Sequence, residues 1–219
     1  MAAKQPVFVR RLVDPTEDEI EECTALLVAA FQAVTDDNFG HSLIGGDKEL
    51  DILLLRAGVR AGIVGGEVWV AGLTEEVTVI CAVAIWFGPG TDYLATEEQR
   101  AAGYNDARSK FSPELKQWYS GYFVPRLDDW QEDCLGKNTT ANSWHLQFLA
   151  TSPDHQHKGF ASALIQAVEP KAHAAGVLMC LETTNDQNVA FYKKRGFAVR
   201  GTISFVGSGG ETIMTCLSK

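Results

Sequence analysis

The stretch that most constrains the fold is Gln156-His157-Lys158-Gly159-Phe160-Ala161. It follows an apolar run, 144–150, and precedes a segment with helical character, 162–175. A strand, a turn and a helix in this order leave free backbone N–H groups at the helix N-terminus, where a partial positive charge favours anions and above all phosphates. Gly159 and Ala161 let a ligand approach that backbone closely, and His157 and Lys158 add donors. The sequence therefore predicts a site for a ligand that carries a pyrophosphate.

A second block strengthens this prediction. Residues 181–197 read LETTNDQNVAFYKKRGF, which indicates a strand, an asparagine-bearing loop, a short helix with a tyrosine and then Gly-Phe. With Gln156, Gly159 and Ala161, which match the motif Gln/Arg-x-x-Gly-x-Gly/Ala, this block resembles the GCN5-related N-acetyltransferase (GNAT) superfamily. The two blocks stand in the family's order and at a suitable separation. The resemblance is best over 144–197 and holds only at the level of pattern before Phe87.

Composition narrows the class of protein. The 219 residues suit one domain, 1–219, and a hydrophobic fraction of 46% with 21% charged residues is ordinary for a globular chain. The net charge of −9 argues against nucleic acid as a partner. No apolar run reaches membrane-spanning length and no secretory signal is present, so we expect a cytoplasmic protein without a membrane partner. Five scattered cysteines without a CxxC pair suit reduced thiols, and no metal site is predicted.

The pattern of elements predicts an α/β (α+β) fold with a mixed central sheet flanked by helices. Thr16 and Glu19 form a capping box for a first helix, and a second helical run covers 48–61. The segments 68–73 and 77–87 are expected to form a hairpin of long strands. A first strand is predicted at 7–13, and later strands at 144–151, 177–183, 197–206 and 211–217, with helices at 159–175 and 187–195. This is the order of the acetyltransferase fold that the resemblance implies.

Residues 88–142 depart from that order, because they separate the third strand from the fourth by some fifty residues where a compact relative turns tightly. Both 97–111 and 113–135 have helical character and carry many aromatic residues, which argues against disorder. By the resemblance, the acceptor substrate enters from this side. We therefore interpret 88–142 as a helical insertion that lines the acceptor site; extra core or a dimer surface is the alternative.

The resemblance implies acetyl-CoA as the co-substrate. It places the pyrophosphate on the residues of the first motif, and the pantetheine arm on the fourth strand and on two asparagines. One backbone N–H near Leu149 would polarise the thioester carbonyl. The predicted cofactor-binding residues are Phe148, Leu149, Ala150, Thr151, Gln156, His157, Lys158, Gly159, Phe160, Ala161, Ser162, Asn185, Asn188 and Tyr192. One of the two asparagines is expected to serve only as a helix cap.

Three residues are candidates for proton transfer. Tyr192 matches the family's tyrosine near the cofactor sulfur, and a phenol with a pKa of about 10 is protonated at neutral pH, as a general acid must be. For the general base, His145 resembles the first of two histidines in serotonin N-acetyltransferase, the second falling on Gln147, which shares its face in a regular strand. Glu182 on the next strand is the other candidate. Water or a group of the insertion stays open as a further alternative.

The sequence thus predicts an enzyme: an N-acetyltransferase that moves the acetyl group of acetyl-CoA directly to a primary amine, without a metal. A small-molecule amine is the expected acceptor, because the insertion would close the open groove that a protein substrate needs. A protein N-terminal or lysine acetyltransferase is one alternative, and a non-catalytic CoA-binding or interaction module is another. The sequence is also compatible with a homodimer.

Overall fold

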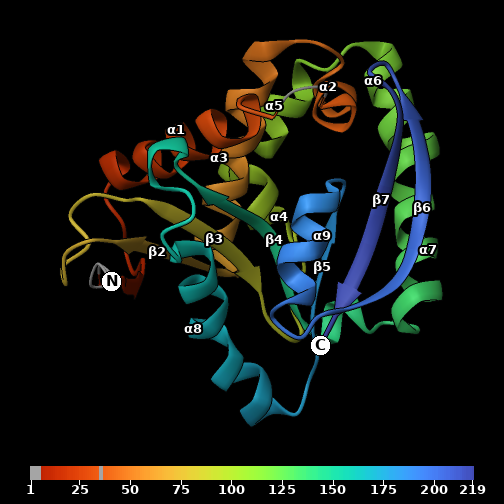
Figure 1. Cartoon of the computed structure of the whole chain (residues 1–219). Coiled ribbons are helices and arrows are strands. Elements are labelled where there is room, and N and C mark those ends of the chain that lie inside the picture. Colours follow the sequence, from red (N-terminus) through yellow and green to blue (C-terminus); the bar gives the residue numbers. More distant parts are fainter. Residues whose placement is uncertain (1–5, 35–36) are drawn as a thin grey trace.

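The computed structural model describes residues 6–34 and 37–219. Its centre is one seven-stranded sheet in the order β1-β2-β3-β4-β5-β7-β6, in which β4 and β5 are parallel and all other neighbours are antiparallel. Figure 1 shows the helices on both faces of this sheet. The strands are β1 (Phe8–Arg11), β2 (Glu67–Gly72), β3 (Ala82–Phe87), β4 (Trp144–Thr151), β5 (Met179–Thr183), β6 (Ala198–Gly207) and β7 (Gly210–Ser218). This architecture confirms the predicted α/β fold.

The helices fall into three groups along the chain. The N-terminal group is α1 (Glu17–Gln32), α2 (Asn38–Ile44) and α3 (Lys48–Gly65). The insertion between β3 and β4 holds α4 (Glu97–Gln99), α5 (Asn105–Ser109), α6 (Pro113–Trp118) and α7 (Val124–Leu135), with a kink at Gly103 between α4 and α5 and a π-helical turn at Tyr119–Phe123. The C-terminal group is α8 (Phe160–Ala175) and α9 (Asp186–Lys193), and short 3₁₀ turns stand at Thr140–Asn142 and Pro153–His155. The predicted helical insertion is therefore confirmed. None of the helices in the described part of the chain is both long and apolar enough to cross a membrane.

The sheet separates two apolar cores. On one face, α8 packs its buried side chains, among them Phe160, Leu164 and Val168, against the strands, and Tyr192 of α9 joins them. On the other face, Leu27 of α1 and Val59 of α3 pack against residues of β2 and β3. Gly58 allows this close approach, because a Cβ there would lie 2.8 Å from the ring of Phe148. Both faces of the central strands are thus covered.

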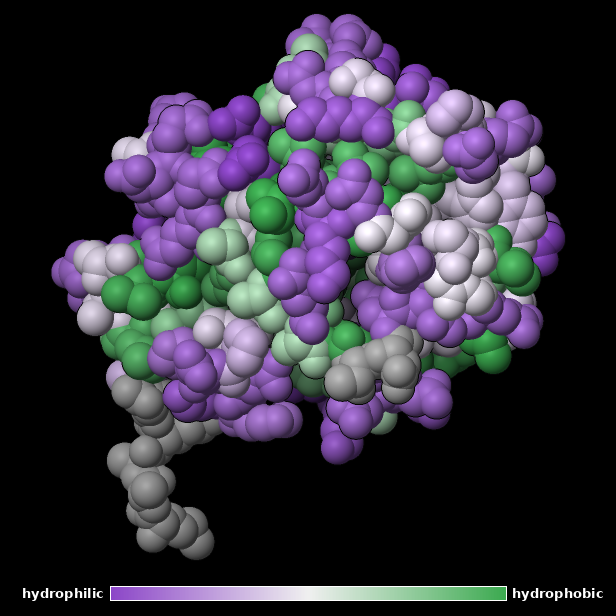
Figure 2. Space-filling view, turned by 90° about the horizontal axis from the view of Figure 1, so that it is seen from above, coloured by the Kyte–Doolittle hydropathy of each residue, from purple (hydrophilic) through white to green (hydrophobic). Residues whose placement is uncertain are grey.

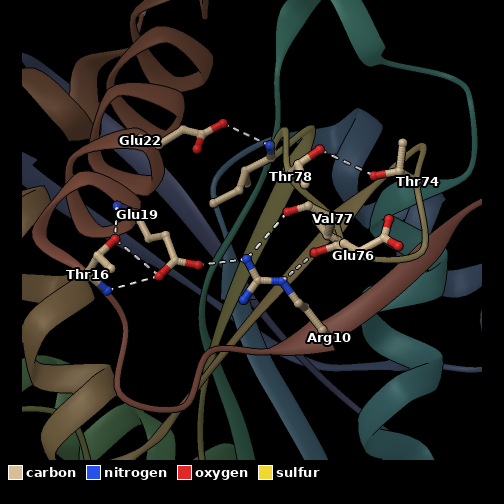
Figure 3. A network of polar contacts seen from close by, with 9 residues as sticks. Arg10, Thr16, Glu19, Glu22, Thr74, Glu76, Val77 and Thr78 are labelled. Atoms are coloured by element: carbon tan, nitrogen blue, oxygen red, sulfur yellow. Dashed lines mark hydrogen bonds and ion pairs between the residues drawn. The ribbon is translucent and has the colours of Figure 1, made fainter.

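The start of α1 is fixed as the sequence predicts. Thr16 accepts a hydrogen bond from the Glu19 N–H, and the Glu19 carboxylate accepts one from the Thr16 N–H at 2.9 Å, which completes the capping box. Arg10 on β1 donates to the same carboxylate at 2.7 Å and to the carbonyl oxygen of Glu76 at 3.0 Å. Figure 3 shows how this one guanidinium ties β1, α1 and the β2–β3 connection together.

The predicted hairpin is wrong in one respect, since β3 begins at Ala82 rather than at Val77. Side chains take the backbone groups that a longer strand would have paired. The Glu22 carboxylate accepts a hydrogen bond from the Ile80 N–H at 2.8 Å, and Arg10 donates to the Val77 carbonyl (Figure 3). Val77 itself has a φ of 47°, which lies outside the strand region. The segment is therefore an irregular connection.

The insertion covers the C-terminal hairpin. Phe123 stacks on Trp118 with ring centroids 4.8 Å apart and meets Phe205 of β6 at 5.1 Å. The outer edge of β6 is covered too, because Trp118 Nε1 donates to the Val206 carbonyl at 2.8 Å and the Tyr122 hydroxyl accepts from the Val206 N–H at 3.1 Å. Unpaired edge groups otherwise invite strand addition by another chain. The insertion therefore builds part of the core as well as one side of the molecule.

Candidate active site

The two central parallel strands part shortly after they meet. Their register holds two pairs, Trp144 with Met179 and His145 with Cys180, although β4 continues to Thr151 and β5 to Thr183. On its other side β4 stays paired with β3 as far as Thr151. The edge of β4 beyond His145 that faces β5 is therefore open for an added strand-like ligand.

A β-bulge lies at the point where the strands part. Ile85 of β3 pairs with Phe148 and Trp86 pairs with Leu146, so Gln147 is the extra residue. The regular alternation of side chains between the two faces of β4 is therefore interrupted at Gln147. Of the predicted cofactor-binding residues on β4, Phe148 and Ala150 belong to the core on the α1 and α3 side, and Leu149 packs against the α8 side.

The first motif folds into the predicted turn before α8. His157 and Gly159 have φ values of 61° and 98°, a conformation that glycine adopts without strain. Gly159 is the N-cap of α8, and within the described chain no side chain caps this helix. The first backbone bond of the helix runs from the Ala163 N–H to the Gly159 carbonyl, at 3.1 Å. Gln156, His157 and Lys158 are exposed at the same turn, and Lys158 Nζ donates to the Asp154 carbonyl at 2.9 Å.

An arginine that the sequence reasoning missed reaches this helix end. Arg195, which follows α9, donates from Nε to the hydroxyl of Ser162 at 3.0 Å, and its guanidinium carbon lies 3.4 Å from the centre of the Phe191 ring. A cation beside the positive end of a helix is unfavourable unless an anion is near. The position of Arg195 next to Gly-Phe in the second motif can be read from the sequence. Its contact with Ser162 can be seen only in the folded structure.

The two asparagines differ in role. Asn185 caps α9, because its side-chain oxygen accepts hydrogen bonds from the N–H groups of Gln187 at 2.8 Å and Asn188 at 3.3 Å. This arrangement confirms that one of them serves as a cap. Asn188 is exposed, and its amide makes a long hydrogen bond of 3.4 Å to the Thr183 hydroxyl. Of the two asparagines, Asn188 is therefore the one whose amide could bind a ligand.

Both candidate bases lie in one hydrogen-bonded pair. His145 Nε2 and Glu182 Oε2 are 2.7 Å apart, although 37 residues separate them in sequence. The side chain of His145 is 7% exposed and that of Glu182 is 12% exposed, so the pair is largely shielded from water. The other carboxylate oxygen, Oε1, accepts a hydrogen bond from Gln131 Nε2 of α7 at 2.9 Å. His145 Nδ1 is buried and has no partner among the described residues.

The pKa values of this pair move in opposite directions. Burial lowers the pKa of His145, but the charge of Glu182 and the hydrogen bond to it outweigh burial, so the pKa rises above its ordinary 6.5. Burial raises the pKa of Glu182, but the charge of His145 and the hydrogen bonds from His145 and Gln131 outweigh it, so the pKa falls below 4.5. Glu182 is therefore ionised at neutral pH, and the protonated form of His145 is favoured relative to a free imidazole.

Tyr192 lies on the opposite face of the sheet. It is 7% exposed within the α8-side core, and its ring meets that of Phe197 at 5.6 Å. Burial raises its pKa, against a smaller lowering by the charge of Arg195, so the phenol stays protonated. Glu182 is paired in register with Cys216 of the insertion-side cluster, whereas its neighbour Leu181 belongs to the α8-side core.

Comparisons with known proteins agree on the class. Residues 90–197 match the model of the acetyltransferase (GNAT) family. An uncharacterised N-acetyltransferase of Schizosaccharomyces pombe is 26% identical over 134 residues, which cover 61% of this chain and 54% of that protein, so the match spans about half of its length.

Two solved structures have similar folds. A polyamine N-acetyltransferase of Drosophila melanogaster has a TM-score of 0.61 at 14% identity, covering 98% of this chain and 99% of that one. A mosquito protein named arylalkylamine N-acetyltransferase-like 5b has a TM-score of 0.62 at 18% identity, with the same coverage of 98% and 99%. Together with the parted parallel strands and the uncapped helix, these likenesses define the GNAT acyltransferase fold. The family model, the curated relative and the fold together support a member of the GNAT superfamily of acetyltransferases, which generally use acetyl-CoA as co-substrate.

Proposed function

We propose that this protein is an N-acetyltransferase that moves the acetyl group of acetyl-CoA directly to the primary amine of a small molecule. One observation carries the proposal: a buried histidine, tied to a carboxylate through Nε2 and unpartnered at Nδ1, stands where β4 and β5 part. The opening between β4 and β5 offers a place for the pantetheine arm and its thioester. His145 at the start of this opening offers a base that can deprotonate an amine.

The residues around the opening fit acetyl-CoA. The N–H groups at the start of α8, beside Lys158 and Arg195, would hold the pyrophosphate, since a helix N-terminus favours negative charge. The pantetheine arm would pair with the open edge of β4. The Ser152 N–H bonds to the Cys81 carbonyl at 2.9 Å, on the β3 side. Because alternate N–H groups of a strand point to opposite edges, the Leu149 N–H is directed to the opening, where it would polarise a carbonyl.

His145 is the general base in this proposal. An ionised carboxylate only accepts hydrogen bonds, so Glu182 requires a proton on Nε2, and the neutral imidazole then carries its free lone pair on Nδ1. That nitrogen would take the proton of the substrate ammonium, directly or through one water. Glu182 fixes the tautomer and stabilises the imidazolium that forms. The raised pKa makes His145 a stronger base than a free imidazole.

Acetyl-CoA supplies an activated acetyl thioester, whose carbon forms a bond to the amine nitrogen while its bond to sulfur breaks. His145 takes the ammonium proton before the attack, and the second proton, which the nitrogen loses as the amide forms, restores the one that Tyr192 gives to the thiolate. The thiolate that leaves takes its proton from the hydroxyl of Tyr192, which burial keeps in the protonated form. Base and acid stand on opposite faces of the sheet, so the thioester would lie between them in the opening.

The acceptor would bind on the His145 face, where α1 and α3 meet the insertion 88–142. The bulk of the insertion supports a small amine, because its helices pack on both α3 and the C-terminal hairpin. Similar folds belong to proteins named for polyamine and arylalkylamine acetylation, which support the same class of acceptor. Figure 2, the view from above, shows apolar patches interleaved with hydrophilic residues on this side of the molecule. Five free thiols support a cytoplasmic location.

A calorimetric titration with acetyl-CoA tests the first half of the proposal. Wild type should bind, and Ala161→Asp should bind more than about tenfold more weakly, because it adds a negative charge at the N-terminus of α8. That charge favours the helix, so a loss of binding would not reflect unfolding. The matched control is Ala174→Asp at the other end of α8, which should lose a little stability and keep its affinity. A folded wild type that binds no acetyl-CoA would overturn the proposed function.

Turnover tests the second half. Release of free CoA is measured with a panel of polyamines, arylalkylamines, amino acids and a lysine peptide. His145→Gln should keep acetyl-CoA binding and lose turnover on the amine that wild type prefers. Binding without turnover on any amine would instead favour a CoA-binding module, and a preference for the peptide would favour a protein acetyltransferase.

A further inference from the structure

A side chain of the insertion completes the hydrogen bonding of the candidate base. Gln131 lies on α7, 51 residues before Glu182 in the sequence, and its Nε2 donates to Glu182 Oε1 at 2.9 Å. The second oxygen of the same carboxylate bonds to His145 at 2.7 Å. Each carboxylate oxygen thus has one donor, and the two donors come from different layers of the fold.

The position of Gln131 is fixed by its neighbours on α7. Trp130 is 7% exposed and packs in the cluster that includes Phe205, Met214 and Cys216, with Leu127 and Cys134 of the same helix at its border. Cys216 is the register partner of Glu182. The helix therefore lies against the strand next to β5, which holds the Gln131 amide within reach of Glu182.

Two features make this hydrogen bond consequential. The His145–Glu182 pair is largely shielded from water, so few solvent molecules can replace a lost donor. A carboxylate with one donor on each oxygen is also held in one rotation about its terminal bond, whereas a carboxylate with one donor is free to turn. The terminal torsion of a glutamate is otherwise broad.

We infer that Gln131 is a positioning residue: its amide orients the Glu182 carboxylate so that Oε2 stays on His145, and the insertion thereby takes part in setting the base. The catalytic meaning of this inference rests on the proposed function. The Gln131–Glu182 contact and its effect on the pKa of His145 do not depend on the proposed function, and both can be measured without substrate.

Other ionisable groups face the pair from the elements around it. Asp92, in the segment after β3, adds negative charge that favours protonated His145. The thiols of Cys180 on β5 and Cys216 on β7 lie near Glu182; burial, with a further contribution from the Glu182 charge, raises the pKa of both, so they stay neutral. A change confined to Gln131 therefore leaves the other charges around His145 in place.

The direction in which the pKa of His145 shifts distinguishes a positioning role of Gln131 from a purely electrostatic effect of its amide dipole. If Gln131 orients Glu182, then Gln131→Met lets the carboxylate turn away, and the pKa of His145 falls by about one unit, since a close opposite charge raises it by about that much or more. If the amide acted only through its positive end, its removal would make the site more negative, and the pKa of His145 would rise. The two roles predict opposite shifts.

The experiment is an NMR titration of the His145 imidazole in the protein without ligands, identified among the five histidines by its absence in His145→Gln. We expect a lower midpoint in Gln131→Met and no change in the matched control Gln117→Met, an exposed glutamine of α6 in the same insertion. In a Glu182→Gln background, Gln131→Met should have no further effect, because the group that it orients is gone. A rise, no shift, or an equal shift in the Glu182→Gln background would overturn the inference.

Kinetics then separate this inference from the proposed function. With a turned-over amine, Gln131→Met should move the acid limb of the kcat/KM profile to lower pH with the NMR midpoint. It should also lower the plateau by about tenfold, as loss of an outer hydrogen-bond partner does for metal ligands. An NMR shift without any turnover in wild type would leave Gln131 as the positioning residue of the pair and would remove the enzymatic proposal alone.

Discussion

At the scale of single residues, the two nitrogens of His145 have different environments. The pH dependence of the free energy of unfolding should reflect the ion pair that one of them forms with Glu182. The pKa of His145 is raised, so its contribution to the free energy of unfolding is complete below the unfolded value of 6.5 and is lost as the pH rises through the folded pKa. The pKa of Glu182 is lowered, so its contribution is complete above 4.5 and is lost as the pH falls through the folded pKa.

We therefore expect the pair to stabilise the fold most between about pH 4.5 and 6.5. Urea unfolding of wild type and of a His145→Gln, Glu182→Gln double variant, from pH 4 to 9, measures the difference. The double variant keeps a polar side chain at both positions and loses both charges. A difference in the free energy of unfolding that stays constant with pH would contradict the opposite pKa shifts.

Tyr192 gives a second prediction at this scale. Tyr192→Phe removes only a hydroxyl from a buried ring, so the free energy of unfolding should change little. Turnover should fall roughly 10²- to 10⁴-fold, the range that general acid–base groups contribute. The affinity for acetyl-CoA, measured by calorimetry, should stay the same. Unchanged turnover would exclude Tyr192 as the acid and leave it as a core tyrosine.

At the scale of elements, the insertion should behave as part of the core. Phe123 is 7% exposed and contacts rings on α2, α6 and β6. Phe123→Ala should therefore cost about 3–5 kcal/mol of stability in chemical denaturation. Its neighbour Val124 is 42% exposed, and Val124→Ala should stay within about 0.5 kcal/mol. Equal small effects would mean that the insertion docks loosely on a core that is complete without it.

Periodicity and local chemistry predicted most of these elements. The strand at 144–151, the helix that begins after Gly159 and the capping box at Thr16 have sequence signals within a few residues, and the structure has them at those places. The helix α2 was missed, because its seven residues are too few to show a helical period. The start of β3 was placed too early, since the side chains that take its backbone groups come from β1 and α1, more than 55 residues away.

The candidate site was predictable as a set of residues but not as a set of contacts. The sequence named His145 and Glu182 as rival bases, and only the parallel register of β4 and β5 makes them a pair. Gln131 carries no local signal, because a glutamine on an exposed helix is ordinary. Its role depends on how α7 packs across β7, which depends in turn on aromatic contacts between the insertion and the hairpin.

At the scale of the whole molecule, the sheet consists of two parts that meet along a short parallel contact. α1 and α3 pack on β2 and β3, whereas α7 of the insertion packs on β6 and β7. Two register pairs, the α8-side core and the His145–Glu182 contact join the parts around the opening. The homodimer considered from the sequence stays a prediction; the covered edge of β6 makes strand addition there an unfavourable route to it.

A ligand that fills the opening should therefore join the two parts, and amide hydrogen exchange can detect this. Acetyl-CoA at about one hundred times its Kd should add about 2.7 kcal/mol to the free energy of unfolding. Protection should increase along residues 146–151 of β4 and 181–183 of β5 as well as at the start of α8. Adenosine 3′,5′-diphosphate, which carries no pantetheine, should at the same degree of saturation protect α8 and leave both strand segments unchanged. If acetyl-CoA protected α8 alone, the thioester arm would lie outside the sheet, and neither His145 nor Tyr192 would be in reach of the reacting carbonyl.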